Sequence, residues 1–187
     1  MNVLLTGGTG YIASHAAVVL MQMGHQVVLY DNLSNSSDGV LTKLTQITNT
    51  HIPFVHGDVR DTPLLSATLS KHNIDAVIHF AGLKAVGESV EKPVDYYANN
   101  VQGTISLLRA MQAHNVKTLV FSSSATVYGQ PQYLPLDENH PTHAALLCWG
   151  LLGTRLILGF SGPAGTYLVN NHANQNMSLL SSFGVVL

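Results

Sequence analysis

The sequence predicts an α/β fold in which a doubly wound parallel sheet is covered by helices on both faces. Short, nearly continuous apolar runs alternate with longer segments of helical periodicity, and the first apolar run ends in a glycine-rich turn. Strands that are apolar throughout are typical of parallel sheets, in which crossover helices bury both faces. The chain has 187 residues, 46% of them hydrophobic and 10% charged, which is enough for one sizeable core.

The first predicted unit runs from a strand through a turn into a helix. Residues 2–6 (NVLLT) form the strand and residues 7–10 (GGTG) the turn. The helix that follows has apolar side chains at helical spacing, and Gly24 ends it. A second strand at residues 26–30 (QVVLY) closes on Asp31 and completes the unit.

The same alternation continues along the chain. It predicts a helix near 63–71, a longer helix from about 93 to 114, and strands at 52–55, 76–80 and 118–122. Binding sites in such sheets form at the carboxyl ends of the strands. Those ends are polar or rich in glycine here, and they comprise residues 7–12, 31–36, 58, 80–84 and 122–126.

The composition indicates which kinds of partner and which cellular location to expect. A formal net charge of −2 gives no broad basic field, so we expect neither nucleic acid nor membrane as a partner, and a small molecule instead. Cys148 is the single cysteine and the chain opens on a strand, which favours a cytoplasmic location. The histidines are scattered, and even His140 and His143 near Asp137 and Glu138 form no ligand pattern, so no metal is expected.

The glycine turn has the spacing of a phosphate-binding loop. In Gly7-x-x-Gly10-x-x-Ala13, small residues let the backbone approach a pyrophosphate, and the start of the helix supplies N–H donors. Glycine turns also serve only to fold a chain. The flanking strand and helix favour cofactor binding here.

Three charged side chains at the strand ends are candidates for cofactor recognition. Asp31 lies about 20 residues after Gly10, where a carboxylate can accept hydrogen bonds from both adenosine ribose hydroxyls and would repel a 2′-phosphate. No Lys or Arg lies between Asp31 and Lys43, so NAD is favoured over NADP, although Asp31 could also simply start a turn. Asp58 could meet the adenine amino group. Lys84 could pair with a phosphate or hydroxyl, or be an ordinary solvated lysine.

Four segments together carry a family resemblance. TGGTGYIASH, Tyr30-Asp31-Asn32, HFAGLKAVGESVEKP and FSSSATVYG closely resemble the UDP-glucose 4-epimerases, extended short-chain dehydrogenases/reductases with a Rossmann domain, over about residues 1–142. The resemblance implies an NAD-dependent isomerase of galactose metabolism that interconverts UDP-glucose and UDP-galactose, with Ser124 near the reacting sugar hydroxyl. The NAD contacts that it implies are Gly7, Gly10, Tyr11, Ile12, Asp31, Asn32, Leu33, Ser34, Asn35, Ser36, Asp58, Val59, Phe80, Ala81, Gly82, Leu83, Lys84 and Asn99.

The sequence departs from the family pattern at two places, the glycine turn and the catalytic pair. Ala13 replaces the usual third glycine, a tolerated change to another small residue. The family's Tyr-x-x-x-Lys pair should occupy positions 149 and 153, where this chain has Trp149 and Gly153. An indole N–H is no base near neutral pH, and glycine carries no ammonium group, so general base catalysis is expected to be absent or very weak.

The C-terminal segment differs in composition from the rest. Arg155 is the one Asp, Glu, Lys or Arg after residue 142. Residues 144–160 are apolar on nearly every face but fall short of the roughly 20 that a membrane span needs, which favours a buried helix and leaves membrane attachment as a minor alternative. We expect an NAD-binding Rossmann domain at 1–142 and an atypical apolar tail at 143–187, hence a truncated fold without the UDP-sugar-binding domain.

Three functions stay open on this reading. One is an epimerase-family chain with an incomplete UDP-sugar site and little activity. Another is a non-catalytic NAD-binding module, forming a homodimer or pairing with a full-length subunit through the helix at 93–114. The third is a nonfunctional truncated product.

Overall fold

A computed structural model describes residues 1–123, 128, 132–137 and 139–141. They divide into two compact units, one formed by residues 1–82 and 98–121 and the other by residues 83–97 with the described residues from 122 on. Everything predicted for the tail at 143–187, including its boundary, lies outside the described residues.

The first unit contains a parallel sheet of five strands. These are β1 (Asn2–Thr6), β2 (Gln26–Asp31), β3 (Phe54–His56), β4 (Ala76–His79) and β5 (Thr118–Phe121). Their order is β3-β2-β1-β4-β5, and every neighbouring pair is parallel. The predicted doubly wound fold is therefore confirmed. The direction of winding reverses at β1, which has β2 on one side and β4 on the other.

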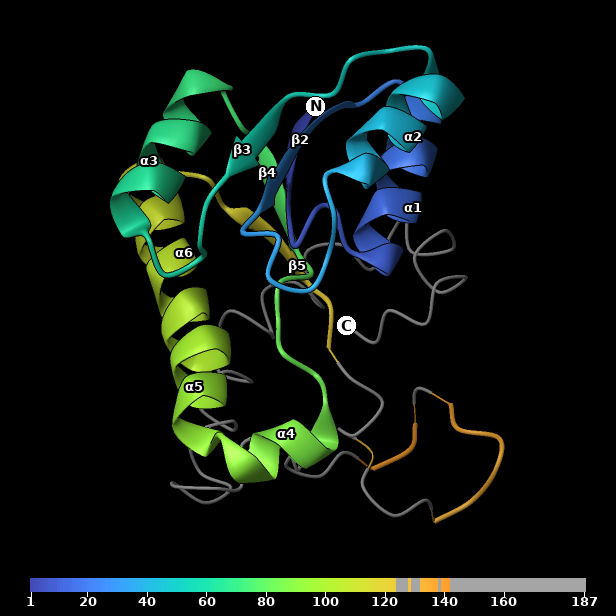
Figure 1. Ribbon diagram of the computed structural model, residues 1–187, viewed down its shortest axis with the longest axis vertical. Coiled ribbons are helices and arrows are strands. Elements are labelled where there is room, and N and C mark those ends of the chain that lie inside the picture. The colour runs from blue at the N-terminus through green and yellow to red at the C-terminus, as the bar shows by residue number, and fades with distance from the viewer. Residues whose placement is uncertain (124–127, 129–131, 138, 142–187) are drawn as a thin grey trace. The chain divides into compact units, whose positions relative to one another are not determined.

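Helices cover both faces of this sheet, as Figure 1 shows. Helices α1 (Tyr11–Gln22) and α2 (Gly39–Thr48) lie on one face, and α3 (Thr62–Lys71) and α6 (Gly103–Ala113) lie on the other. Side chains alternate along β1, so Val3 and Leu5 join the core on the first face while Leu4 joins the core on the second. A strand buried on both faces has to be apolar at every position, as the first predicted strand is.

Residues in the left-handed conformation end the main helices. Gly24 (φ +85°) follows α1, and its N–H donates to the Met21 carbonyl, while His25 N–H donates to Leu20. Asn73 and Asn115 take the same conformation after α3 and α6. Glycine and asparagine tolerate this geometry better than other residues. The predicted end of the first helix at Gly24 is thus confirmed.

The structure differs from the sequence prediction in three helices. The single helix expected from 93 to 114 consists of α5 (Pro93–Tyr97), a π-helix η1 (Ala98–Gln102) and α6. Near the junction of η1 and α6 the Thr104 hydroxyl donates to the Asn100 carbonyl at 2.6 Å, and such a bond competes with regular helical pairing. Helices α2 and α4 (Val86–Glu91) were not expected.

Within residues 83–97 of the second unit, a buried tyrosine joins α4 to α5. The Tyr96 hydroxyl donates to Glu88 Oε2 at 2.9 Å and accepts the Ala85 N–H at 3.2 Å. Burial, followed by the hydrogen bond to Glu88, raises the pKa of the Tyr96 phenol. Within the described part of the chain, no helix is long and apolar enough to cross a membrane.

Candidate functional site

The glycine turn after β1 touches the backbone that follows β4. Gly7 has a φ of +66°, and a Cβ placed on it would lie 2.7 Å from Ala81 N and 3.0 Å from the Phe80 carbonyl carbon. The Gly10 N–H closes the turn by donating to the Gly7 carbonyl at 2.9 Å. These contacts join the carboxyl ends of β1 and β4 where the winding of the sheet reverses, the place at which doubly wound sheets bind ligands.

The start of α1 provides donors suited to an anion. The N-cap residue Gly10 is extended and gives no side-chain cap, and the first turn has no acidic residue. The first intrahelical bond is from Ser14 N–H to the Gly10 carbonyl, so helix geometry leaves the N–H groups of residues 11–13 without intrahelical acceptors. A Cβ on Gly10 would meet one neighbour within 4 Å, the Gly7 oxygen at 3.0 Å, so a ligand can approach this backbone closely. Together with the helix dipole, the arrangement fits a phosphate group.

Ala13 is fully enclosed in the core beneath the turn, against the same apolar cluster as Val3 and Leu29. Helix α1 therefore packs closely on the sheet with alanine in place of the family's third glycine.

The buried Asp31 carboxylate ties the glycine turn to the loop after β2. Its Oδ2 accepts the Thr9 N–H at 3.1 Å, and its Oδ1 accepts the Leu33 N–H at 2.8 Å and the Ser36 hydroxyl at 3.3 Å. Because the Ser36 proton goes to Asp31, the Thr9 hydroxyl is the donor in its 2.7 Å bond to Ser36 Oγ. A carboxylate has about four acceptor positions, so Asp31 retains room for a further donor.

The loop after β2 is strongly constrained at Leu33. This residue has a φ of +58°, a conformation that costs a non-glycine residue about 1–2 kcal/mol. The bond from its N–H to Asp31 stabilises it, and the next N–H, that of Ser34, donates to Asn32 Oδ1 at 3.0 Å. Two successive side chains thus hold residues 31–36 in a fixed path beside the glycine turn.

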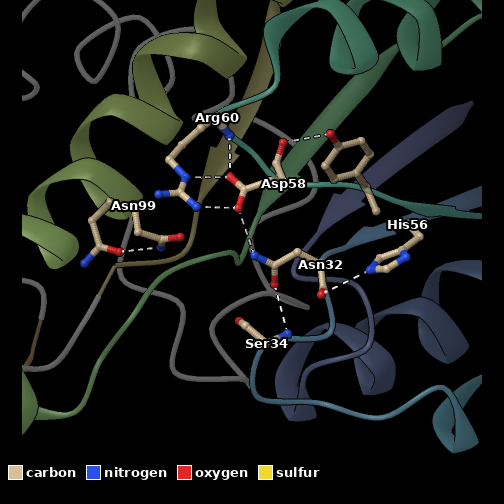
Figure 2. Close-up of polar contacts among 8 residues, drawn as sticks. Asn32, Ser34, His56, Asp58, Arg60 and Asn99 are labelled. Carbon is tan, nitrogen blue, oxygen red and sulfur yellow. Dashed lines mark hydrogen bonds and ion pairs between the residues drawn. The ribbon is translucent and has the colours of Figure 1, made fainter.

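Asp58, just beyond β3, lies in a network of polar side chains (Figure 2). Its Oδ1 accepts the backbone N–H and Nε–H of Arg60 at 2.9 and 2.8 Å, and its Oδ2 accepts Arg60 Nη2 at 2.7 Å and Asn32 Nδ2 at 3.1 Å. The hydrogen bonds from Arg60 hold the pKa of Asp58 well below its ordinary value. The Tyr30 hydroxyl donates to the Asp58 carbonyl at 2.8 Å, and burial is the main cause that raises the pKa of that phenol.

A buried histidine that sequence reasoning missed links the sheet to α6. His79 Nδ1 lies 2.6 Å from Thr6 Oγ1, and Nε2 lies 3.2 Å from Thr104 Oγ1. Since the Thr104 proton goes to the Asn100 carbonyl, Nε2 carries the imidazole proton and Nδ1 accepts from Thr6. Thr6 and His79 directly precede the two segments that meet at Gly7. The signal in the sequence was a histidine ending an otherwise apolar strand, AVIH.

The remaining predicted NAD contacts fall into different surroundings. Tyr11 is 81% exposed, whereas Val59 and Phe80 are buried in the core. Ala81 and Gly82 are partly exposed, and Asn99 lies in η1, where its Nδ2 donates to Asn100 Oδ1 at 3.0 Å (Figure 2).

Other predicted site residues lie in the second unit or outside the described residues. Leu83 and Lys84 belong to the second unit, and desolvation lowers the pKa of the Lys84 ammonium group. Ser124, Trp149 and Gly153 lie outside the described residues.

Of the residues considered for metal binding, Glu138 and His143 lie outside the described residues, among which no group of three His, Cys, Asp or Glu could hold an ion. His140 bonds backbone groups through both ring nitrogens. Its Nε2 accepts the Gln132 N–H at 3.0 Å, so Nδ1 donates to the Pro141 carbonyl at 2.9 Å.

Sequence comparison relates the chain to nucleotide-sugar enzymes. Residues 4–146 match the family model described as GDP-mannose 4,6 dehydratase. The UDP-glucose 4-epimerase of Yersinia enterocolitica is 54% identical over 138 residues, covering 74% of this chain and 41% of that protein. The human UDP-glucose 4-epimerase is 53% identical over 147 residues, covering 75% and 42%. The chain thus spans about two fifths of the length of these curated relatives.

Solved structures give the same relationship. A UDP-glucose-4-epimerase from Stenotrophomonas maltophila with bound NAD and formylated UDP-arabinopyranose superposes with a TM-score of 0.79 at 47% identity, covering 88% of this chain and 49% of that one. The enzyme from Bifidobacterium longum in complex with NAD+ and UDP gives a TM-score of 0.77 at 47% identity, covering 86% and 48%.

Proposed function

The chain belongs to the family whose model is described as GDP-mannose 4,6 dehydratase, and from this premise we propose that it is an NAD-binding chain of UDP-glucose 4-epimerase type. We propose further that this chain by itself does not epimerise UDP-sugars. Its relatives with solved structures include epimerases that contain NAD, which supports the choice of cofactor.

The observation that carries the proposal is the position of Asp31. Its carboxylate is fixed by the Thr9 N–H at the end of β2, directly beside the glycine turn. There its remaining acceptor position can take a hydrogen bond from the ribose of a dinucleotide whose pyrophosphate lies against the turn and the start of α1. A phosphate on the ribose 2′-hydroxyl would face this carboxylate, which supports NAD over NADP.

The residues present fit such a cofactor without rearrangement of the turn. Gly7 allows the two strand ends to touch, Gly10 leaves the backbone accessible, and the first N–H groups of α1 offer donors for the pyrophosphate. Bound NAD would supply a hydride acceptor and donor. The role of this chain's own residues is to bind the dinucleotide and to hold its ribose at Asp31.

The proposal of inactivity rests on the family's catalytic pair. Trp149 and Gly153 stand where a tyrosine base and a lysine are expected, and neither can remove a proton from a sugar hydroxyl near neutral pH. Ser124 can orient a proton but does not remove it unaided.

Calorimetric titration of the purified full chain with NAD tests the cofactor assignment. We expect saturable binding that Asp31→Ala abolishes and Asp31→Asn weakens by at least about tenfold, because the charged acceptor for the ribose is lost. The asparagine variant keeps a side-chain oxygen that can accept a backbone N–H of the loop, so its loss of affinity cannot be put down to misfolding of the loop. Asp38→Ala, at an exposed carboxylate that makes no capping bond, should bind like the wild type.

An activity assay completes the test. With NAD saturating, conversion of UDP-glucose to UDP-galactose by the purified chain should stay at background. Measurable turnover would overturn the reading of Trp149 and Gly153, and absence of NAD binding by a folded chain would overturn the cofactor assignment.

A further inference from the structure

The carboxylate of Asp58 has no acceptor position left over. Its two oxygens offer about four lone-pair positions, and four N–H groups fill them. Three of these donors belong to Arg60 and the fourth is the side-chain amide of Asn32 (Figure 2). Any further donor that binds Asp58 has to take the place of one of these.

A donor from the dinucleotide is expected at this place. Asp31 is paired with His56 across β2 and β3, so Asp58 begins the loop beside the one that Asp31 begins. If Asp31 holds the adenosine ribose, as the proposed function has it, the attached base lies near this neighbouring loop. Asp58 would then be placed to accept a hydrogen bond from the exocyclic amino group of adenine, the role that its sequence position predicts.

The four donors on Asp58 differ in strength. The Arg60 side chain contributes two charge-assisted bonds of 2.8 and 2.7 Å, and its backbone N–H is part of the chain path that follows β3. The Asn32 amide is an uncharged donor, and its bond of 3.1 Å is the longest of the four. It is the donor that Asp58 exchanges most readily.

The amide of Asn32 also matches the incoming group in chemistry. Both the carboxamide and the amino group of adenine are planar NH₂ donors. We propose that Asn32 competes with the adenine amino group for Asp58 Oδ2, so that this side chain sets the affinity and the base selectivity of the dinucleotide site. The proposal rests on the proposed NAD site and assigns Asn32 the role of an internal competitor.

Removing the competitor should tighten NAD binding. In Asn32→Ala no bond to Asp58 has to be broken, and we expect the Kd for NAD to fall roughly fivefold to tenfold, the value of about one such hydrogen bond. Nicotinamide hypoxanthine dinucleotide has a carbonyl in place of the amino group, and its remaining donor, N1–H, lies one position away on the ring, so it lacks the NH₂ that would take the place of the Asn32 amide. Its affinity should not rise in the same variant.

Two further variants separate this role from a structural one. Asn32→Ser removes the amide donor but keeps a side-chain oxygen for the Ser34 N–H, so it should also bind NAD more tightly even if the alanine variant folds poorly. In an Asp58→Ala background, Asn32→Ala should leave the Kd for NAD unchanged. Gln46→Ala, which deletes an exposed amide on α2, is the matched control and should bind as the wild type does.

The outcomes distinguish the inference from the function on which it rests. Wild-type binding of NAD with no gain in either Asn32 variant would show that Asn32 does not compete, while the proposed function stands. An equal gain for both dinucleotides, or a gain that persists without Asp58, would also overturn the inference. If the folded wild type bound neither dinucleotide, the NAD site and the inference would both be wrong.

Discussion

Two substitutions together measure how much the close contact between the glycine turn and the backbone after β4 matters for the free energy of unfolding. Gly7 and Gly24 both have positive φ, +66° and +85°, so alanine at either position is strained by about 1–2 kcal/mol. A Cβ at Gly24 would meet nothing within 4 Å, whereas a Cβ at Gly7 would lie 2.7 and 2.9 Å from Ala81 backbone atoms. Gly24→Ala therefore reports the backbone strain alone.

The difference between the two variants gives the energy of the close approach. Carbon atoms normally meet at about 3.5–4.0 Å, so the Gly7 turn or the segment at Ala81 would have to move by roughly 1 Å. Overpacking of this kind costs about 1–3 kcal/mol. We expect Gly24→Ala to lower the free energy of unfolding by about 1–2 kcal/mol, and Gly7→Ala by about 2–5 kcal/mol.

Urea unfolding followed by far-ultraviolet circular dichroism measures both values, and a titration with NAD on the folded variants completes the comparison. Gly24→Ala should retain NAD binding, since Gly24 ends α1 at the opposite end from the turn. Gly7→Ala should bind NAD more weakly because the turn is displaced. Equal losses of stability in the two variants would refute the reasoning, since the contact with Ala81 would then have no energetic weight.

Three more results are expected. Gly10→Ala, at a φ of −67° that any residue adopts but with its Cβ 3.0 Å from the Gly7 oxygen, should lower the unfolding midpoint less than Gly7→Ala does while weakening NAD binding, and a variant with wild-type affinity would contradict a close backbone approach. NADP should bind at least about tenfold more weakly than NAD in competition titrations, because Asp31 faces the ribose; equal affinities would remove that role. Hydrogen bonds from Arg60 lower the pKa of folded Asp58, so its stabilising contribution is present above the unfolded-state pKa of about 4 and is lost as pH falls toward the lower folded value. Thermal melts between about pH 7 and pH 3 should therefore show a smaller loss of stability at acid pH in Arg60→Met than in the wild type. Identical profiles would show that the hydrogen bonds between Arg60 and Asp58 do not stabilise the fold.

Much of the sheet follows from local pattern. The strand at Asn2–Thr6 was predicted with its observed bounds, because the run is apolar at every position between its ends and a glycine turn follows it. The third strand was predicted at 52–55 and is found at Phe54–His56, since Pro53 has no N–H to give to the ladder. Helix α2 was missed although Val40, Leu44 and Ile47 have helical spacing, because a run of polar turn residues precedes it and threonines, which have low helix propensity, lie among the apolar residues.

The site was less accessible to the sequence because its contacts join distant segments. Asp31 was identified from its spacing to Gly10, but the bond from the Thr9 N–H that fixes its carboxylate depends on the fold. Arg60 was overlooked because a basic residue two positions after Asp58 is ordinary in sequence. Only its conformation turns it into a donor of three bonds to one carboxylate.

The position of β1 in the sheet has a consequence for synthesis on the ribosome. β1 pairs first with β2 and completes its other side with β4, where Thr6 pairs with His79. At about 5–20 residues per second, His79 leaves the ribosome roughly 4–15 s after Thr6. Throughout that interval one edge of an apolar strand stays open to any other nascent chain. Slower translation at this stage, or a chaperone that shields residues 2–6, should therefore change the yield of folded protein.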